Sequence, residues 1–202
     1  MKVELLSITP EPEKHIELCG RTCYQSYSKI TEDSSSRFIR MILENEHESV
    51  LEHASATFRI SGISRAMTHQ LVRHRLASYS QKSQRYCKEE QFEYVMPPSI
   101  EKHKNKLPKA IYKNIIEDMQ YAYRHLIDCG VPKEDARFIL PNACTTEIVM
   151  TANFRNWRHI IKMRCSKHAQ WEIRDVMCEV LKVLYSKAPS VFRDLFNLYI
   201  GN

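Results

Sequence analysis

Residues 70–86 read QLVRHRLASYSQKSQRY and form the densest polar stretch of this 202-residue chain. Helical periodicity leads into this stretch and predicts a helix over about 63–74. On such a helix, Gln70, Arg73 and His74 stand at positions i, i+3 and i+4 and share one face. The residues that follow are hydroxyls and amides bracketed by two more arginines, a composition suited to binding phosphate groups and heterocycles. The alternative interpretation is a polar loop whose arginines are solvated.

Outside this stretch, the chain combines helical patterns with a few strands that are distant in sequence. Alternating polar and apolar residues predict strands at 2–9, 54–61 and 144–152. Periodicity and capping residues predict helices at 12–24, 34–45, 63–74, 106–129, 154–165 and 168–187, and a short last one that starts at Pro189. This mixture predicts an α+β fold: a single domain over 1–202, with a central, mostly antiparallel sheet flanked by helices.

The helix expected over 106–129 is amphipathic, and Gly130 and Pro132 end it. Its apolar residues recur at helical spacing, at Leu107, Ile111, Ile115, Met119, Ala122 and Leu126. On the preceding helix, over 63–74, Met67 and Leu71 are expected to point toward the core.

Composition excludes several classes of protein. Only 4 glycines occur, and none forms a dinucleotide-fold or P-loop motif, so a bound nucleotide is not held by a glycine turn. The 7 cysteines form no C-x-x-C pair and have no zinc-finger spacing, which predicts reduced thiols and no metal site. No apolar run reaches the roughly 18 residues of a membrane span, and the start lacks a signal-peptide pattern, so we expect a cytoplasmic protein.

The formal net charge of +6 indicates polyanionic partners, either nucleic acid or phosphorylated small molecules. Arginines concentrate in two places, 73–85 and 155–164. A nucleic-acid-binding protein is therefore an alternative function. Against it, the segment 63–86 lacks a helix-turn-helix glycine turn, and the basic residues are mixed with a buried stripe instead of covering one face.

The second arginine cluster lies on the helix expected over 154–165, for which Asn153 is a plausible N-cap. Trp157, Ile160 and Ile161 mark its buried stripe, and Arg164 continues this stripe. An arginine on an inward face must meet an anion or a strong acceptor, because an unpaired buried charge is too costly. The alternative to a functional role is an internal ion pair with a carboxylate such as that of Glu172.

Arg73-His74-Arg75, followed after seven residues by Ser83, resembles the R-H-R-x7-S signature of the flavin-dependent thymidylate synthases. The likeness extends over nearly the whole chain, through His47–His53, Ala136–Pro141, the Asn153-x-Arg155 helix start, and Arg164 followed by His168–Glu172. One departure is Ser80, where asparagine is common in the family.

The resemblance implies a homotetramer with active sites shared between subunits. It implies reductive methylation of dUMP to dTMP, with methylenetetrahydrofolate as carbon donor and NADPH as reductant acting through bound FAD. No nucleic-acid or membrane partner is implied.

The family motifs assign roles to residues of this chain. By motif position, FAD is expected to contact Ser49, Arg73, His74, Arg75, Gln81, Asn153, Arg155 and His159. The nucleotide is expected to contact Gln70, Arg73, Gln81, Ser83, Gln84, Arg85, Arg137 and Arg164. Arg164 is the expected catalytic residue, stabilising negative charge at N3 and O2 of the uracil.

Folate-only thymidylate synthases activate uracil with a cysteine that adds to C6. No cysteine lies inside the arginine-rich motif here, although Cys87 follows it and Cys165 follows Arg164. Polarisation of the base by arginines can replace covalent activation, because preorganised donors in a water-poor site stabilise developing charge. We therefore expect no cysteine nucleophile, with Cys165 as the main rival. A further alternative is a flavoprotein of the same fold that has lost methyl transfer.

Overall fold

The computed structural model describes residues 1–201. They divide into two compact units, each built from separate stretches of the chain. The first unit comprises Met1–Ile60, Leu71–Ser80 and Val149–Asn202, and the second comprises Ser61–Gln70 and Gln81–Ile148.

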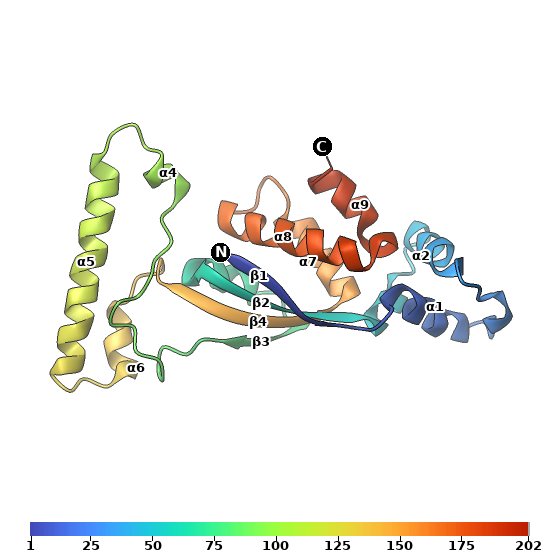
Figure 1. The fold of residues 1–202 in the computed structure, drawn as a ribbon, viewed down its shortest axis with the longest axis horizontal. Coiled ribbons are helices and arrows are strands. Elements are labelled where there is room, and N and C mark those ends of the chain that lie inside the picture. Colours follow the sequence, from blue (N-terminus) through green and yellow to red (C-terminus); the bar gives the residue numbers. More distant parts are fainter. Residues whose placement is uncertain (202) are drawn as a thin grey trace. The chain divides into compact units, whose positions relative to one another are not determined.

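An antiparallel sheet of four strands gives the chain its framework, as the sequence predicts in class and pairing direction. The strands are β1 (Lys2–Ile8), β2 (Ser55–Ser64), β3 (Ala77–Gln81) and β4 (Thr145–Asn153), in the order β1-β2-β4-β3 (Figure 1). Along β4 each second side chain, from Thr146 to Ala152, is buried, which is the alternation of a strand with one covered face. The Thr57 and Thr151 hydroxyls form a hydrogen bond of 2.9 Å across β2 and β4.

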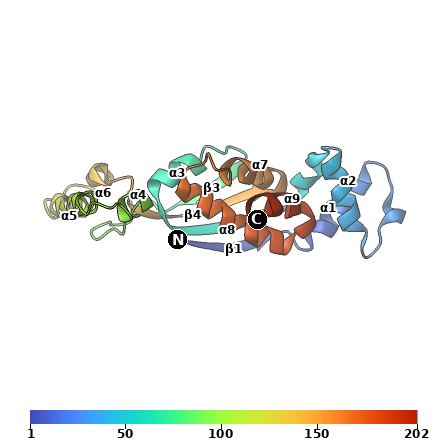
Figure 2. The same ribbon diagram turned by 90° about the horizontal axis from the view of Figure 1, so that it is seen from above.

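Five helices belong to the first unit: α1 (Pro12–Thr22), α2 (Ser34–Glu44), α7 (Phe154–Arg164), α8 (Trp171–Lys187) and α9 (Pro189–Tyr199). Short 3-10 helices η1 (Tyr27–Lys29) and η2 (Glu48–His53) complete it. Helices α7, α8 and α9 cover one face of the sheet (Figures 1 and 2). The predicted inward stripe of α7 is confirmed, because Trp157, Ile160 and Ile161 are fully buried.

Aromatic packing fixes α7 against the sheet and against α9. The rings of Phe58 on β2 and Trp157 on α7 meet edge to face at 5.3 Å, and the Trp157 indole N–H donates to the Ala56 carbonyl at 3.1 Å. The rings of Phe154 and Phe192 pack edge to face at the same separation. The start of α7, where Asn153 and Arg155 lie, is therefore held by aromatic packing against the sheet and α9.

The second unit contains α4 (Pro98–Glu101), α5 (Leu107–Asp128), α6 (Lys133–Ala136), the 3-10 helix η3 (Arg137–Ile139) and most of α3 (Arg65–Leu71). Phe92, Ile116 and Cys144 form a small core there. The predicted long helix is confirmed as α5. The apolar stripe expected on it is largely exposed in the single chain, however, including Leu107, Ile111 and Ile115.

Three element predictions need correction. The helix predicted over 63–74 ends at Leu71, because the Tyr79 hydroxyl donates to the carbonyls of Leu71 and His74, both at 2.9 Å, and supports a turn. Gln70, Arg73 and His74 therefore do not share one helical face. The polar segment expected over 75–86 contains β3. Residues 47–49, for which the sequence pattern predicts a turn before the strand over 54–61, lead into the 3-10 helix η2.

Among residues 1–201, no helix combines the length and apolar character needed to cross a bilayer.

Candidate functional site

A cavity of about 500 Å³ in the first unit collects several of the expected cofactor residues. Three elements contribute to its walls: η2, the turn before β3, and the first turns of α7. The lining residues are Glu48, Glu52, Leu76, Asn153, Arg155, Asn156, His159 and Lys162. The cavity thus brings η2 together with Asn153, Arg155 and His159, which lie far from residues 47–53 in the sequence.

The start of α7 is fixed by two asparagines. The predicted N-cap is confirmed, since Asn153 Oδ1 accepts a hydrogen bond of 2.8 Å from the backbone N–H of Asn156. The Asn156 amide in turn donates to the Leu76 carbonyl at 2.8 Å. Asn156 therefore ties the turn that carries Arg73, His74 and Arg75 to the beginning of α7.

The cavity contains both acidic and basic groups. Arg155 Nη1 lies 2.6 Å from the Glu52 carboxylate, and both side chains are about half exposed. The Glu48 carboxylate lies 3.5 Å from Lys162 Nζ and 3.5 Å from Nε of the buried Arg158. Arg158 is buried, but Arg155 and Lys162 are about half exposed, and exposed ion pairs contribute little stability and rearrange easily. The arginine and lysine can thus turn to a bound anion without a large loss of stability.

Arg164, at the end of α7, donates from Nε to Nε2 of His74 at 3.0 Å. His74 is 7% exposed, and its ring meets the ring of His159 edge to face at 6.2 Å. The inward-facing arginine expected from the helical spacing therefore meets a strong acceptor, an imidazole nitrogen.

Burial lowers the pKa of His74 to about 4, and the positive charge of Arg164 and the nearby His159 add to this effect. His74 is thus neutral at pH 7, with Nε2 as the acceptor and the proton on Nδ1. As pH falls from about 6.5 toward 4, the unfolded chain binds a proton at this residue before the folded chain does. The free energy of unfolding therefore decreases over this window.

Three other expected cofactor residues of the first unit are exposed. Ser49 lies on η2, and Arg73 and Arg75 flank His74 in the turn before β3. Arg73 and Arg75 are exposed while His74 between them is buried.

In the second unit, Gln81 and Gln84 have defined partners. The Gln81 amide donates to the hydroxyls of Thr68 at 3.0 Å and Thr146 at 3.3 Å. Gln84 is buried, and its amide donates to Cys144 Sγ at 3.7 Å. Gln70 lies half-buried in the last turn of α3.

Two arginines expected at the nucleotide meet on Glu134. Arg85 contacts the Glu134 carboxylate through Nε at 3.1 Å and Nη2 at 3.0 Å, and Arg137 Nε donates to the Glu134 carbonyl at 3.0 Å. The Ser83 hydroxyl accepts a hydrogen bond of 3.3 Å from the Arg85 backbone N–H. Ser83, Arg85 and Arg137 therefore form one group of hydrogen-bond donors and cations suited to a phosphate.

The two suspected cysteines differ in environment. Cys165 is 5% exposed, and a hydrogen bond with the Cys178 thiol together with burial raises its pKa far above the usual range. Cys87 is exposed and follows the turn that begins at Ser83. A nucleophilic cysteine needs a lowered pKa, so the environment of Cys165 opposes this role.

Sequence reasoning missed four residues that support these groups. Glu52 pairs with Arg155, Asn156 holds the turn before β3, Glu134 joins two arginines, and Tyr79 ends α3. Glu52, Asn156 and Glu134 act through partners distant in sequence, and an alternating polar pattern gives no sign of such pairing. Tyr79 acts through carbonyls five and eight residues before it. The only local signal was that Asn156 follows three residues after an N-cap asparagine.

Comparisons with known proteins identify the family to which this chain belongs. Residues 4–190 match the family model described as thymidylate synthase complementing protein. The flavin-dependent thymidylate synthase of Geobacter sulfurreducens is 45% identical, with 96% of this chain and 86% of the relative covered. Proteins of the same name from Clostridium tetani, 39% identical with 96% and 86% covered, and Nitratidesulfovibrio vulgaris, 41% identical with 95% and 85% covered, also match. The chain belongs to the flavin-dependent thymidylate synthases, a family of flavoprotein methyltransferases of dTMP biosynthesis.

Proposed function

We propose that this protein catalyses reductive methylation of dUMP to dTMP, with methylenetetrahydrofolate as carbon donor and NADPH as reductant through bound FAD. The observation that carries the proposal is the contact between Arg164 and neutral His74 at the end of α7. It fixes a planar cation beside a group that stays uncharged at pH 7. Such a cation can stabilise negative charge that develops on the uracil ring.

Arg164 is the proposed catalytic residue. The Nε–H of its guanidinium group donates to His74, which directs that N–H toward the imidazole. The two Nη atoms form the edge that we propose to face N3 and O2 of the uracil. By stabilising negative charge at these atoms, Arg164 would favour the electron-rich form of the ring in which C5 is nucleophilic, without a covalent bond to a protein side chain.

The residues of the first unit fit a flavin dinucleotide. A diphosphate requires cations and N–H donors, and the cavity at the start of α7 offers Arg155, Lys162 and a helix N-terminus with no acidic residue in its first turn. The proposed FAD contacts in this unit are Ser49, Arg73, His74, Arg75, Asn153, Arg155 and His159, and the family motif adds Gln81. When bound, FAD supplies the hydride chemistry that the side chains cannot perform.

The group around Glu134 is proposed to bind the phosphate of dUMP. When phosphate binds, Arg85 and Arg137 would leave Glu134 and turn to the phosphate. The Ser83 hydroxyl would hold the turn that carries Arg85. Gln70, Arg73, Gln81, Gln84 and Arg164 complete the proposed nucleotide contacts. Ser83 is not a nucleophile in this proposal, because its hydroxyl accepts a hydrogen bond from Arg85 and no base activates it among the described contacts.

A homotetramer with shared active sites is part of the proposal, and the exposed apolar surface of the second unit supports it. Leu107, Ile111 and Ile115 on α5 are each about half exposed, and Phe138, beside Arg137, is 80% exposed. Apolar stripes of this kind mark surfaces that bind other proteins. Association of subunits along α5 would bury them.

The proposed location is the cytoplasm. All seven cysteines are free, as expected in a reducing compartment. The nucleic-acid alternative is less well supported. Arg85, Arg155 and Arg158 each pair with a carboxylate, so these arginines form no continuous basic face.

The activity is tested directly with the purified protein and FAD. We expect a yellow tetramer that forms dTMP from dUMP, methylenetetrahydrofolate and NADPH, with a flavin spectrum that NADPH bleaches. Size-exclusion chromatography, absorbance and product analysis measure these properties. A flavin that bleaches without any dTMP would favour the flavoprotein that has lost methyl transfer, and a colourless protein that binds no FAD would overturn the proposal.

Arg164→Ala is expected to lower turnover roughly 100-fold or more and to weaken dUMP binding, because a donor to the developing charge is lost. Arg164→Lys is expected to restore little, since a point charge cannot reproduce a planar two-pronged contact. Steady-state rates and dUMP titrations at saturating FAD give both quantities. Near wild-type turnover in Arg164→Ala would assign this arginine to an internal, purely structural contact.

A double variant tests the absence of a cysteine nucleophile. Cys87→Ala combined with Cys165→Ala is expected to keep dTMP formation within roughly tenfold of wild type, about 1.4 kcal/mol in the barrier. FAD and dUMP binding are measured in the same preparation to separate chemistry from folding. A variant that binds both ligands yet forms no dTMP would show that a thiol takes part in the reaction.

A further inference from the structure

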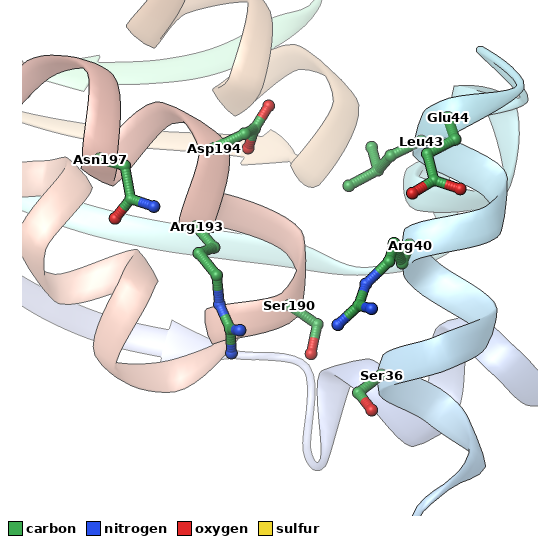
Figure 3. Close-up of a pocket in the computed structure, with 8 residues that line it drawn as sticks. All are labelled: Ser36, Arg40, Leu43, Glu44, Ser190, Arg193, Asp194 and Asn197. Carbon is green, nitrogen blue, oxygen red and sulfur yellow. The ribbon is translucent and has the colours of Figure 1, made fainter.

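A second cavity of the first unit lies between α2 and α9 and shares no lining residue with the candidate functional site. Its volume is about 560 Å³, within the range of small-molecule sites. On both helices successive lining positions are three or four residues apart or adjacent, so each helix contributes one face. The lining residues are Ser36, Arg40, Leu43 and Glu44 from α2, and Ser190, Arg193, Asp194 and Asn197 from α9 (Figure 3).

The apolar residues of both helices lie on the neighbouring faces, which pack into the core and leave the polar residues at the cavity. Phe38, Ile39 and Ile42 of α2 are buried, as are Phe192 and Leu195 of α9. The packing of these apolar residues fixes the two helices and therefore the distance between the polar faces. Buried packing thus sets the position of the cavity, although Arg40, Glu44, Arg193, Asp194 and Asn197 on its walls are exposed.

Asp194, which lines the cavity, and Glu13, which contacts the lining residue Ser190, are already engaged by the protein. Asp194 accepts two hydrogen bonds from the buried Arg158, at 2.8 and 2.7 Å. Glu13 accepts from the backbone N–H of Ser190 at 2.6 Å and from its hydroxyl at 2.9 Å. The start of α9 is thus capped by a protein carboxylate, and any ligand would lie along the side of the helix.

Arg40 and Arg193, the two arginines that line the cavity, differ from these carboxylates. Figure 3 shows the guanidinium groups of Arg40 and Arg193 directed toward the same end of the cavity, where Ser36 and Ser190 lie. Glu44 lies with Leu43 farther along α2. Within residues 1–201, the ion pairs and hydrogen bonds that engage Arg21, Arg85, Arg155 and Arg158 have no counterpart at Arg40 or Arg193.

We propose that this α2–α9 cavity binds a phosphorylated small molecule, whose phosphate group contacts Arg40 and Arg193. Two guanidinium groups on opposite walls repel one another without a counterion, and an anion between them removes this repulsion. Arginine binds phosphate oxygens through two parallel N–H donors, so two arginines suit a doubly charged phosphate monoester.

The other end of the cavity defines the remainder of the ligand. Glu44 offers carboxylate oxygens and Asn197 an amide, which can accept hydrogen bonds from hydroxyl groups. Leu43 provides an apolar contact between the two ends. The ligand class is therefore a phosphate monoester on a hydroxylated body, such as a sugar phosphate or a nucleotide.

Binding is tested with ribose 5-phosphate as the probe on the FAD-loaded protein, with dUMP present. Arg40→Gln and Arg193→Gln are each expected to weaken binding at least fivefold in calorimetric titrations. Arg37→Gln is the matched control, because Arg37 is an exposed arginine of the same helix that does not line the cavity, and it is expected to change binding less than twofold. Binding of ribose, which lacks the phosphate, is expected to be the same in wild type, Arg40→Gln and Arg193→Gln.

The result that overturns the proposal is equal binding of ribose 5-phosphate by wild type, Arg40→Gln and Arg193→Gln. An equal loss in Arg37→Gln would also overturn it, since it would indicate a general effect of positive charge. All three positions are exposed, so the variants are expected to fold, and circular dichroism checks this. These variants all lie outside the proposed active site, and the experiment measures binding and not turnover. Its outcome therefore does not depend on whether the proposed methylation is correct.

Discussion

The donation from Arg164 to an uncharged His74 is the interaction on which the candidate functional site depends. A charged imidazole would repel the guanidinium group. If the imidazole were solvated, water would compete with it for the Arg164 Nε–H. Burial of His74 prevents both, because it disfavours the protonated form. The end of α7 and the turn before β3 are thereby joined by one hydrogen bond between a fixed cation and a neutral acceptor.

Several local features keep this pair in place. Asn153 caps α7, and Asn156 holds the same turn through the Leu76 carbonyl. Tyr79 binds the carbonyls of Leu71 and His74, which ends α3 early enough for His74 to leave the helix and face α7. Trp157 anchors α7 on the sheet. Exposed Arg73 and Arg75 flank the buried imidazole, so one short motif combines a structural side chain with two exposed cations.

Much of the fold was predictable because its signals are local. The strands around Ser55 and Thr145, the amphipathic α5 and the Asn153 cap follow from alternation, periodicity and side-chain capping. Strand β3 was missed because residues 77–81 lack β-branched side chains and pair through the backbone. The apolar stripe of α5 was found by its spacing, but spacing does not distinguish a core from an exposed surface. Glu52 and Glu134 were missed because their partners, Arg155 and Arg85, lie 103 and 49 residues away.

The most direct test of the central claim is the pKa of His74, measured by NMR on protein labelled at the histidine ring nitrogens. A series of spectra between pH 4 and 8 would follow its Nε2 and Nδ1 signals, with His74→Gln used to assign them. We predict a neutral ring with the proton on Nδ1 throughout this range until close to pH 4, and a higher pKa in Arg164→Ala. A ring that titrates near 6.5 in wild type, unchanged by Arg164→Ala, would contradict the account.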